Sequence, residues 1–187
     1  MQTYIAILRG INVSGQKRIA MNELKSLFEE LNCRDVKTYI QSGNVIFNHT
    51  SVDDQQQARE IERKLVQKYT FQVPVLVRSQ SEWAHIAAHN PFLKETGIEI
   101  DKLHVTFLSE VPSAVNSDKI KDLQFGKDRF ILAGKEIYVN CPSGYGTTKL
   151  SNSFFENKLK VTATTRNWKT VNELLKIAES VSDEAGK

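Results

Sequence analysis

Hydrophobic positions in the first half of the chain show the spacing of strands in some segments and the spacing of helices in others. Residues 4–8 form a continuous apolar run that ends at Arg9-Gly10, which is too short for a helix and predicts a central strand. In chain order the predicted elements are strand 4–8, a helix from the N-cap Asn22 to Leu31, strands 36–40 and 45–47, a helix opened by a capping box at Ser51 and Asp54 and reaching Tyr69, and strand 73–77. Because the last strand contains Pro74, we expect it at a sheet edge.

The second half shows a similar pattern without a repeated sequence. Ser79 and Glu82 have the spacing of a helix capping box, and residues 103–107 alternate as in a half-buried strand. A hairpin is predicted around Gly134-Lys135, because a glycine in the first turn position suits a type II′ turn. A final helix begins near Trp168 and carries an apolar stripe.

Together these patterns predict an α+β protein with two ferredoxin-like halves of the βαββαβ type and antiparallel sheets. The second half is expected to be less complete and to end in a C-terminal helix. We place the halves at residues 1–78 and 79–187 and expect a structural duplication.

Composition excludes several classes of protein. The 187 residues are 40% hydrophobic and 25% charged with a net charge of +3, which is typical of a globular chain. No apolar run approaches the roughly 20 residues of a membrane span, so no membrane association is predicted. Cys33 and Cys141 have no metal-ligand or disulfide spacing, which favours a reducing compartment, and we expect a cytoplasmic location.

No catalytic residue, metal site or cofactor is predicted. His85 and His89 are four residues apart on a predicted helix, but Ile86 stands where a zincin helix carries its glutamate and no third ligand is evident. The chain also lacks a Walker A loop, a dinucleotide fingerprint and a nucleophile elbow.

Positive charge is concentrated in two segments. Residues 1–22 carry +3 and no acidic residue, and residues 144–172 carry +4, which leaves −4 for the rest of the chain. This segregation predicts a local positive field that attracts phosphate or carboxylate groups. Two solvated basic faces would give the same pattern.

Topology predicts where part of this charge gathers. In a βαββαβ sheet the loop after the first strand and the turn between the second and third strands leave the same edge. We therefore expect these two segments to be neighbours and to form a ligand site containing Arg9, Asn12, Lys17, Gln41, Ser42 and Asn44. The alternative is structural: Arg9 bonded to protein groups, and the amides satisfying loop backbone.

A second group of candidates lies in the other half. If Asn167 caps the last helix, Arg166 stands beside a helix N-terminus, where an anion is favoured. Lys149 follows a glycine-containing loop and is the other predicted ligand contact. Trp168 continues the apolar stripe of its helix and is interpreted as a core residue rather than a stacking surface.

Several of these segments together resemble one known family. The motifs are Leu8-Arg9-Gly10-Ile11-Asn12-Val13, residues 38–47, Asn90-Pro91-Phe92, Gly144-Tyr145-Gly146 with Lys149-Leu150, and residues 164–168. In this order they are similar to the bacterial family called "domain of unknown function 1697", over about residues 3–180. Ser14 and Thr148 depart mildly from its pattern. The resemblance implies an α+β fold with ferredoxin-like halves in one family-length unit, and no established activity.

Three hypotheses about function follow. The leading one is that a basic cleft binds a phosphate-bearing ligand, either a nucleotide or a nucleic acid. The second is an enzyme that acts on an anionic substrate, although the loop residues include no evident nucleophile or general base. The third is a homo-oligomeric interaction module, and the sequence leaves the oligomeric state open.

Overall fold

The computed structural model describes the backbone of residues 1–185 and the side chains of residues 1–182. The chain forms two compact units. The first contains residues 1–85 and 173–187, and the second contains residues 86–172. The sequence placed the division at 78/79 and the C-terminal helix wholly in the second half, whereas the structure groups most of that helix with the first unit.

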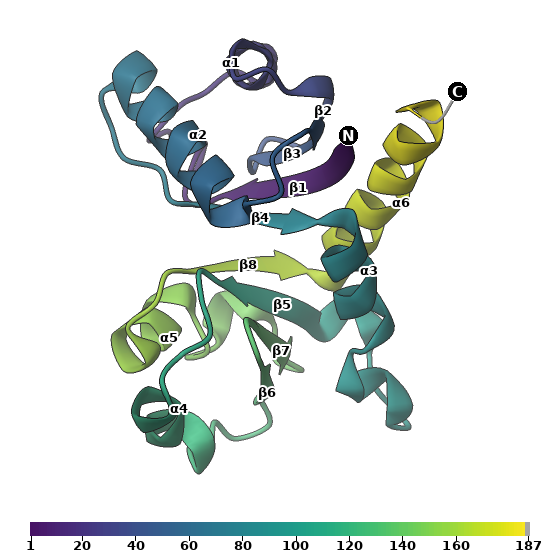
Figure 1. Ribbon diagram of the computed structural model, residues 1–187. Coiled ribbons are helices and arrows are strands. Elements are labelled where there is room, and N and C mark those ends of the chain that lie inside the picture. Colours follow the sequence, from purple (N-terminus) through teal and green to yellow (C-terminus); the bar gives the residue numbers. More distant parts are fainter. Residues whose placement is uncertain (186–187) are drawn as a thin grey trace. The chain divides into compact units, whose positions relative to one another are not determined.

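The first unit has the strand order of a ferredoxin-like fold (Figure 1). Its elements are β1 (Gln2–Leu8), α1 (Met21–Glu30), β2 (Arg34–Tyr39), β3 (Asn44–His49), α2 (Asp54–Tyr69) and β4 (Val75–Ser79), followed by α3 (Gln80–Ala88). The sheet order is β2-β3-β1-β4 and all neighbouring strands are antiparallel. The edge position of β4 confirms the expectation drawn from Pro74, which directly precedes the strand.

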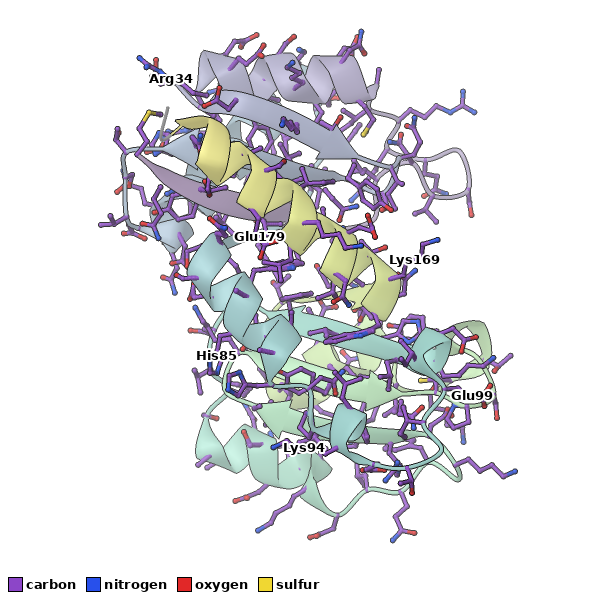
Figure 2. The ribbon with its side chains drawn as sticks, turned by 90° about the vertical axis from the view of Figure 1, so that its right-hand side faces the viewer. Arg34, His85, Lys94, Glu99, Lys169 and Glu179 are labelled. Carbon is purple, nitrogen blue, oxygen red and sulfur yellow. The ribbon has the colours of Figure 1, made fainter. Side chains whose placement is uncertain are left out.

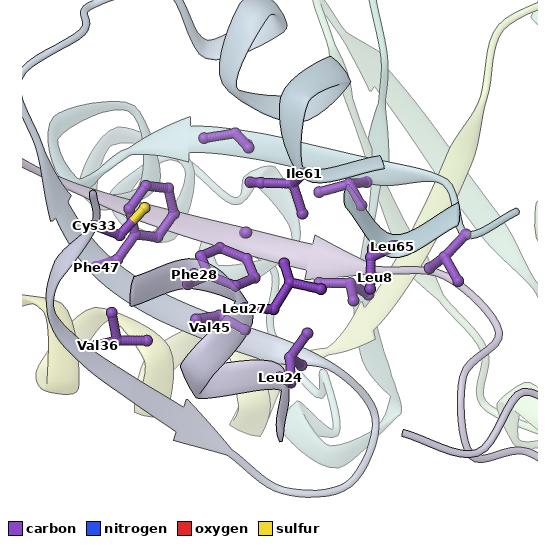
Figure 3. Close-up of a cluster of buried hydrophobic side chains, with 14 of the residues drawn as sticks. Leu8, Leu24, Leu27, Phe28, Cys33, Val36, Val45, Phe47, Ile61 and Leu65 are labelled. Carbon is purple, nitrogen blue, oxygen red and sulfur yellow. The ribbon is translucent and has the colours of Figure 1, made fainter. Parts of the chain in front are cut away.

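Helices α1 and α2 pack over one face of this sheet and bury the main core of the unit (Figure 3). Tyr4, Ala6 and Leu8 point to this face because side chains alternate along β1. The Phe28 ring meets Phe47 edge to face, with ring centroids 5.2 Å apart. The spacing that predicted α1 thus marks the residues that it buries.

The opposite face of the same sheet carries Thr3, Ile5 and Ile7, all buried. Helix α6 (Trp168–Ala185) reaches this face through its C-terminal half, because the Ser182 hydroxyl lies 2.7 Å from that of Thr3. β1 is therefore covered on both faces, which explains its continuous apolar sequence.

The second unit repeats this architecture. Its elements are η1 (Pro91–Lys94), η2 (Ile100–Lys102), β5 (Leu103–Leu108), α4 (Ala114–Lys121), β6 (Arg129–Ala133), β7 (Glu136–Asn140), η3 (Tyr145–Thr147), α5 (Asn152–Leu159) and β8 (Ala163–Asn167), with the start of α6. The sheet order β6-β7-β5-β8 matches the first sheet strand for strand. The second half is thus complete, because β8 supplies a fourth strand that the polar sequence Thr164-Thr165-Arg166 did not indicate.

Equivalent hydrogen bonds support a structural duplication. Glu62 of α2 accepts a bond from the first backbone N–H of β4, and Glu156 of α5 does the same for β8. Helices α2 and α5 both end at a left-handed residue, Thr70 and Lys160. The capping box of Ser79 and Glu82 and the two-residue hairpin at Gly134-Lys135 are also confirmed.

Within the described residues, every helix is too short or too polar to cross a bilayer.

Replacing Leu27 by alanine tests the first core. Leu27 is fully buried, so Leu27→Ala should lower the free energy of unfolding by about 2–5 kcal/mol through lost burial and a residual cavity. Val52→Ala is the control, because Val52 is 82% exposed and should change stability by less than about 0.5 kcal/mol. Urea denaturation measures both, and equal midpoints would contradict the assigned packing.

Candidate functional site

Two loops of the first unit meet at one edge of its sheet. The segment after β1, residues 9–20, is joined to the β2–β3 turn by the Asn12 side chain, whose Nδ2 donates to the Gln41 carbonyl at 2.9 Å. Asn12 also closes its own loop, because Nδ2 donates to the Ile19 carbonyl and Oδ1 accepts from the Ile19 amide, both at 2.9 Å. The predicted meeting of these loops is confirmed.

The β2–β3 turn approaches the first loop so closely that only glycine fits at its centre. Gly43 has φ +77°, and a Cβ atom there would lie 2.7 Å from Ile11 Cδ1 and 2.8 Å from Leu8 Cβ. Its carbonyl accepts a bond from the Leu8 amide at 2.8 Å. The neighbouring Ile40 also has a positive φ of 50°, which is costly for a β-branched residue and marks a constrained turn.

A hollow of about 440 Å³ lies where the two loops meet. Asn12, Gly15 and Arg18 of the first loop line it together with Gln41 of the turn. Arg18 is exposed and forms no hydrogen bond or ion pair with any described residue. The hollow therefore offers one cationic side chain and the exposed Gln41 side chain to a ligand, because both Nδ2 hydrogens of Asn12 are already used within the protein.

The other residues predicted at this edge form hydrogen bonds to protein groups. The Lys17 ammonium donates to the Gln72 carbonyl at 2.6 Å, and the half-buried Arg9 donates its backbone N–H to the Pro74 carbonyl at 2.9 Å. Asn44 is fully buried, and its Nδ2 donates to the Tyr39 carbonyl and to Ser42 Oγ, both at 3.0 Å. For Asn44 and Ser42 the structural alternative fits this geometry, because their side chains hold the turn.

Sequence reasoning assigned a contact to Lys17 and missed its neighbour Arg18. Both belong to the same basic segment, so composition did not separate them. The difference arises in the backbone: Gly15 and Lys17 both adopt positive φ, and this reversal places Arg18 Nη2 3.4 Å from the position that a Gly15 Cβ would take. Such a reversal is settled by loop packing rather than by residue type.

The two candidates of the second unit lie in separate segments, Arg166 on a strand and Lys149 in a loop. Arg166 lies on β8, where its Nη1 donates to the Thr165 carbonyl at 3.0 Å, and burial lowers the pKa of its guanidinium to about 10. It therefore remains protonated at neutral pH. Asn167 caps α6 as predicted, since its Oδ1 accepts from the Thr170 amide at 2.8 Å, and Trp168 is buried. Lys169 follows in the first turn of α6 (Figure 2).

Lys149 lies outside β8 and α6. It follows η3, is exposed, and has no hydrogen-bonding or ionic partner among the residues that the structure describes. Within the second unit it is thus available to solvent and to ligands, whereas Arg166 already uses part of its hydrogen-bonding capacity.

Both cysteines are buried and pack as small hydrophobic side chains. Burial raises the pKa of the Cys33 thiol to about 12 and also raises the pKa of Cys141. Over the described part of the chain, no three His, Cys, Asp or Glu side chains gather as a metal site would require.

The Asn12 bridge can be tested by removing its amide. Asn12→Ala should lower the free energy of unfolding by about 1–3 kcal/mol, because it leaves the Ile19 amide without its acceptor. Hydrogen exchange at the Ile19 amide should accelerate. Asn22→Ala is the matched control, since the side-chain amide of Asn22 forms no hydrogen bond with any of the described residues. Unchanged exchange at Ile19 would exclude the bridge.

Thiol reactivity tests the burial of the cysteines. At pH 8 the raised pKa values leave both thiols protonated in the folded chain, so an aromatic disulfide reagent should modify them far more slowly than in guanidinium chloride. The thiolate fraction, and with it the rate, should rise with pH. Equal rates in the folded and unfolded chain would show that these thiols are accessible.

Comparison with known proteins agrees with this fold. The chain is similar to the solved structure of the conserved bacterial protein SP0830 from Streptococcus pneumoniae, with 22% sequence identity and a TM-score of 0.67. The match covers 95% of this chain and 98% of that chain, and it shows a likeness of fold alone. No curated protein matches the sequence.

A family model described as "Protein of unknown function (DUF1697)" matches residues 1–138. This range contains both loops of the hollow and the Asn90-Pro91-Phe92 motif, whereas the motifs after residue 140 lie beyond it. The resemblance drawn from the motifs is thereby confirmed, and because the match extends over well more than half of the sequence, the chain belongs to the DUF1697 family.

Proposed function

We propose that the hollow between residues 9–20 and the β2–β3 turn binds a phosphate-bearing ligand, with Arg18 as its main cationic contact. The observation that carries this proposal is Arg18 itself: it is an exposed guanidinium without a partner in the described chain, and it lines a hollow of about 440 Å³. A guanidinium presents several N–H donors in a planar fork that matches phosphate oxygens.

The construction of the two loops supports binding of an anion. Residues 1–22 contain no acidic residue, so no carboxylate of this segment competes with a ligand for Arg18. The Asn12 bridge holds the two walls of the hollow together before any ligand arrives. A site ordered in advance loses less conformational entropy on binding.

The lining residues favour binding over catalysis. Arg18 supplies positive charge and Gln41 a side-chain amide, and such groups position and stabilise an anion. Acid–base or nucleophilic chemistry would require a carboxylate, imidazole or thiol beside the ligand, and the described lining of the hollow contains none. The enzyme hypothesis therefore has less support than the binding hypothesis.

The phosphate-bearing ligand is either a nucleotide or a nucleic acid, and the two differ in their expected contacts and salt dependence. A nucleic acid would contact further cations along its backbone, for which Arg9 and Lys17 of the same unit are the candidates. Lys149 and Arg166 belong to the second unit and are not part of this site. Its affinity would fall steeply with salt, because bound phosphates release counterions. A nucleotide held by one guanidinium and one amide would show a milder dependence.

Calorimetric titration with pyrophosphate, AMP, ATP and a single-stranded oligonucleotide tests the proposal. We expect at least one probe to bind, and Arg18→Ala to weaken it at least tenfold, because the cationic contact is lost. Arg34→Ala is the control, since Arg34 is an exposed arginine of β2 in the same unit, outside the hollow (Figure 2). A probe bound at 100 times its Kd should also raise stability by about 2.7 kcal/mol.

Two results would contradict the proposal. One is that none of the phosphorylated probes binds the native chain. The other is that a probe binds but Arg18→Ala and Arg34→Ala weaken it equally, which would show a diffuse electrostatic attraction instead of a site in the hollow.

A further inference from the structure

The two units treat the same edge of their sheets differently. In the first unit the edge strand β2 is interrupted by a bulge between Arg34 and Lys37, and Asp35 within it has φ +52°. Helix α1 packs beside this strand and buries Leu24, Leu27 and Phe28. A bulge, charged side chains and a covering helix are the features that protect an edge strand from pairing with another chain.

The corresponding strand of the second unit, β6, lacks these protections. Its five residues pair with β7 in regular register without a bulge, and after Arg129 their side chains are uncharged. Helix α4, the counterpart of α1, buries only Ile120, and its main packing partner is α5. β6 is thus left as an open, regular and largely apolar edge.

The hairpin register shows which backbone groups of β6 are free. Ala133 and Glu136 flank a two-residue turn, so they form a hydrogen-bonded pair, and such pairs alternate along antiparallel strands. Ile131 therefore bonds to β7, while the N–H and C=O groups of Phe130 and Leu132 point to the open edge. In the described chain no other strand lies on that side of β6.

A cavity of about 610 Å³ runs along this edge. Residues 129–132 of β6 line it, together with Ile120 of α4 and Phe125 of the following loop. Phe125, Phe130 and Leu132 are only partly buried, although they pack on the core of the unit. The cavity thus offers apolar side-chain contacts beside the unpaired backbone of the strand.

The charged residues of the cavity lining indicate which charge its occupant should carry. The ionisable residues that line the cavity are Asp118, Lys121, Asp128 and Arg129, two of each sign, and Arg129 is already paired with Glu95 at 2.6 Å. A lining with balanced charge offers no net attraction to a charged ligand and complements an uncharged one.

We propose that β6 is a strand-addition site for an extended, uncharged peptide segment of a partner protein. The segment pairs its backbone with Phe130 and Leu132 and inserts a bulky apolar side chain into the cavity beside Phe125. Backbone bonds supply affinity in this mode of recognition, and the cavity supplies specificity. The site lies wholly in the second unit and is independent of the hollow in the first.

Hydrogen exchange on the full chain tests this site. The probes are acetylated and amidated heptapeptides of alternating threonine and apolar residues, with Phe, Trp, Leu or Val at the centre. At saturation the best peptide should slow exchange at the Phe130 and Leu132 amides at least tenfold and leave Ile131, which already bonds to β7, unchanged. The same peptide with alternate amides N-methylated should bind at least tenfold more weakly.

A charged substitution on the edge provides a second measurement. Ile131→Lys should weaken the best peptide at least tenfold, because it places a charge on a partly exposed side chain of the cavity lining. Val111→Lys is the control, since Val111 is an exposed apolar residue of the same unit outside the cavity.

Three results would overturn the proposal. If no peptide protects Phe130 and Leu132, β6 is not a docking edge. If N-acetylphenylalanine amide binds as tightly as the best peptide, the cavity is a small-molecule site and the strand edge is not used. If sedimentation shows self-association and the two amides are protected without peptide but lose protection on dilution, the occupant is a second copy of this chain.

Discussion

The central strand β1 is hydrogen-bonded along both edges and covered on both faces, and this constraint determines where the loops of the first unit lie. Because β3 and β4 both run antiparallel to β1, the segment leaving β1 and the turn entering β3 emerge together. The Asn12 amide then joins them, and Gly43 allows the close approach. The hollow with Arg18 is thus a consequence of strand order and two local contacts.

The two units share one scaffold but differ in their loops and in the cover of their edge strands. Shared features include the strand order, the glutamates that accept the first amide of β4 and β8, and the left-handed ends of α2 and α5. The first unit covers its edge strand and has its hollow at a loop edge, whereas the second leaves β6 open beside a cavity. A duplicated fold can therefore present different surfaces in its two units, because strand order does not specify loops and helix lengths.

The prediction that two distant segments meet succeeded because topology alone decides their position. That the loop after β1 lies beside the β2–β3 turn follows from the βαββαβ order, and the bond from Asn12 to the Gln41 carbonyl confirms it. The roles of individual side chains did not follow in this way. Asn44 is buried and holds the turn, Lys17 bonds to the Gln72 carbonyl, and Arg18 faces the hollow instead. These outcomes depend on left-handed backbone at Gly15 and Lys17, which residue types do not reveal.

By itself the sequence determined the elements whose hydrophobic period is strong, the caps at Ser79 and Asn167, the hairpin at Gly134 and the concentration of charge, because each depends on neighbouring residues. Only the tertiary structure decided that Thr164-Thr165-Arg166 forms strand β8, and that most of α6 belongs to the first unit. It also decided which arginine faces the hollow and that β6 is left uncovered. These features depend on pairing and packing between distant segments, and a local pattern contains no information about its distant partner.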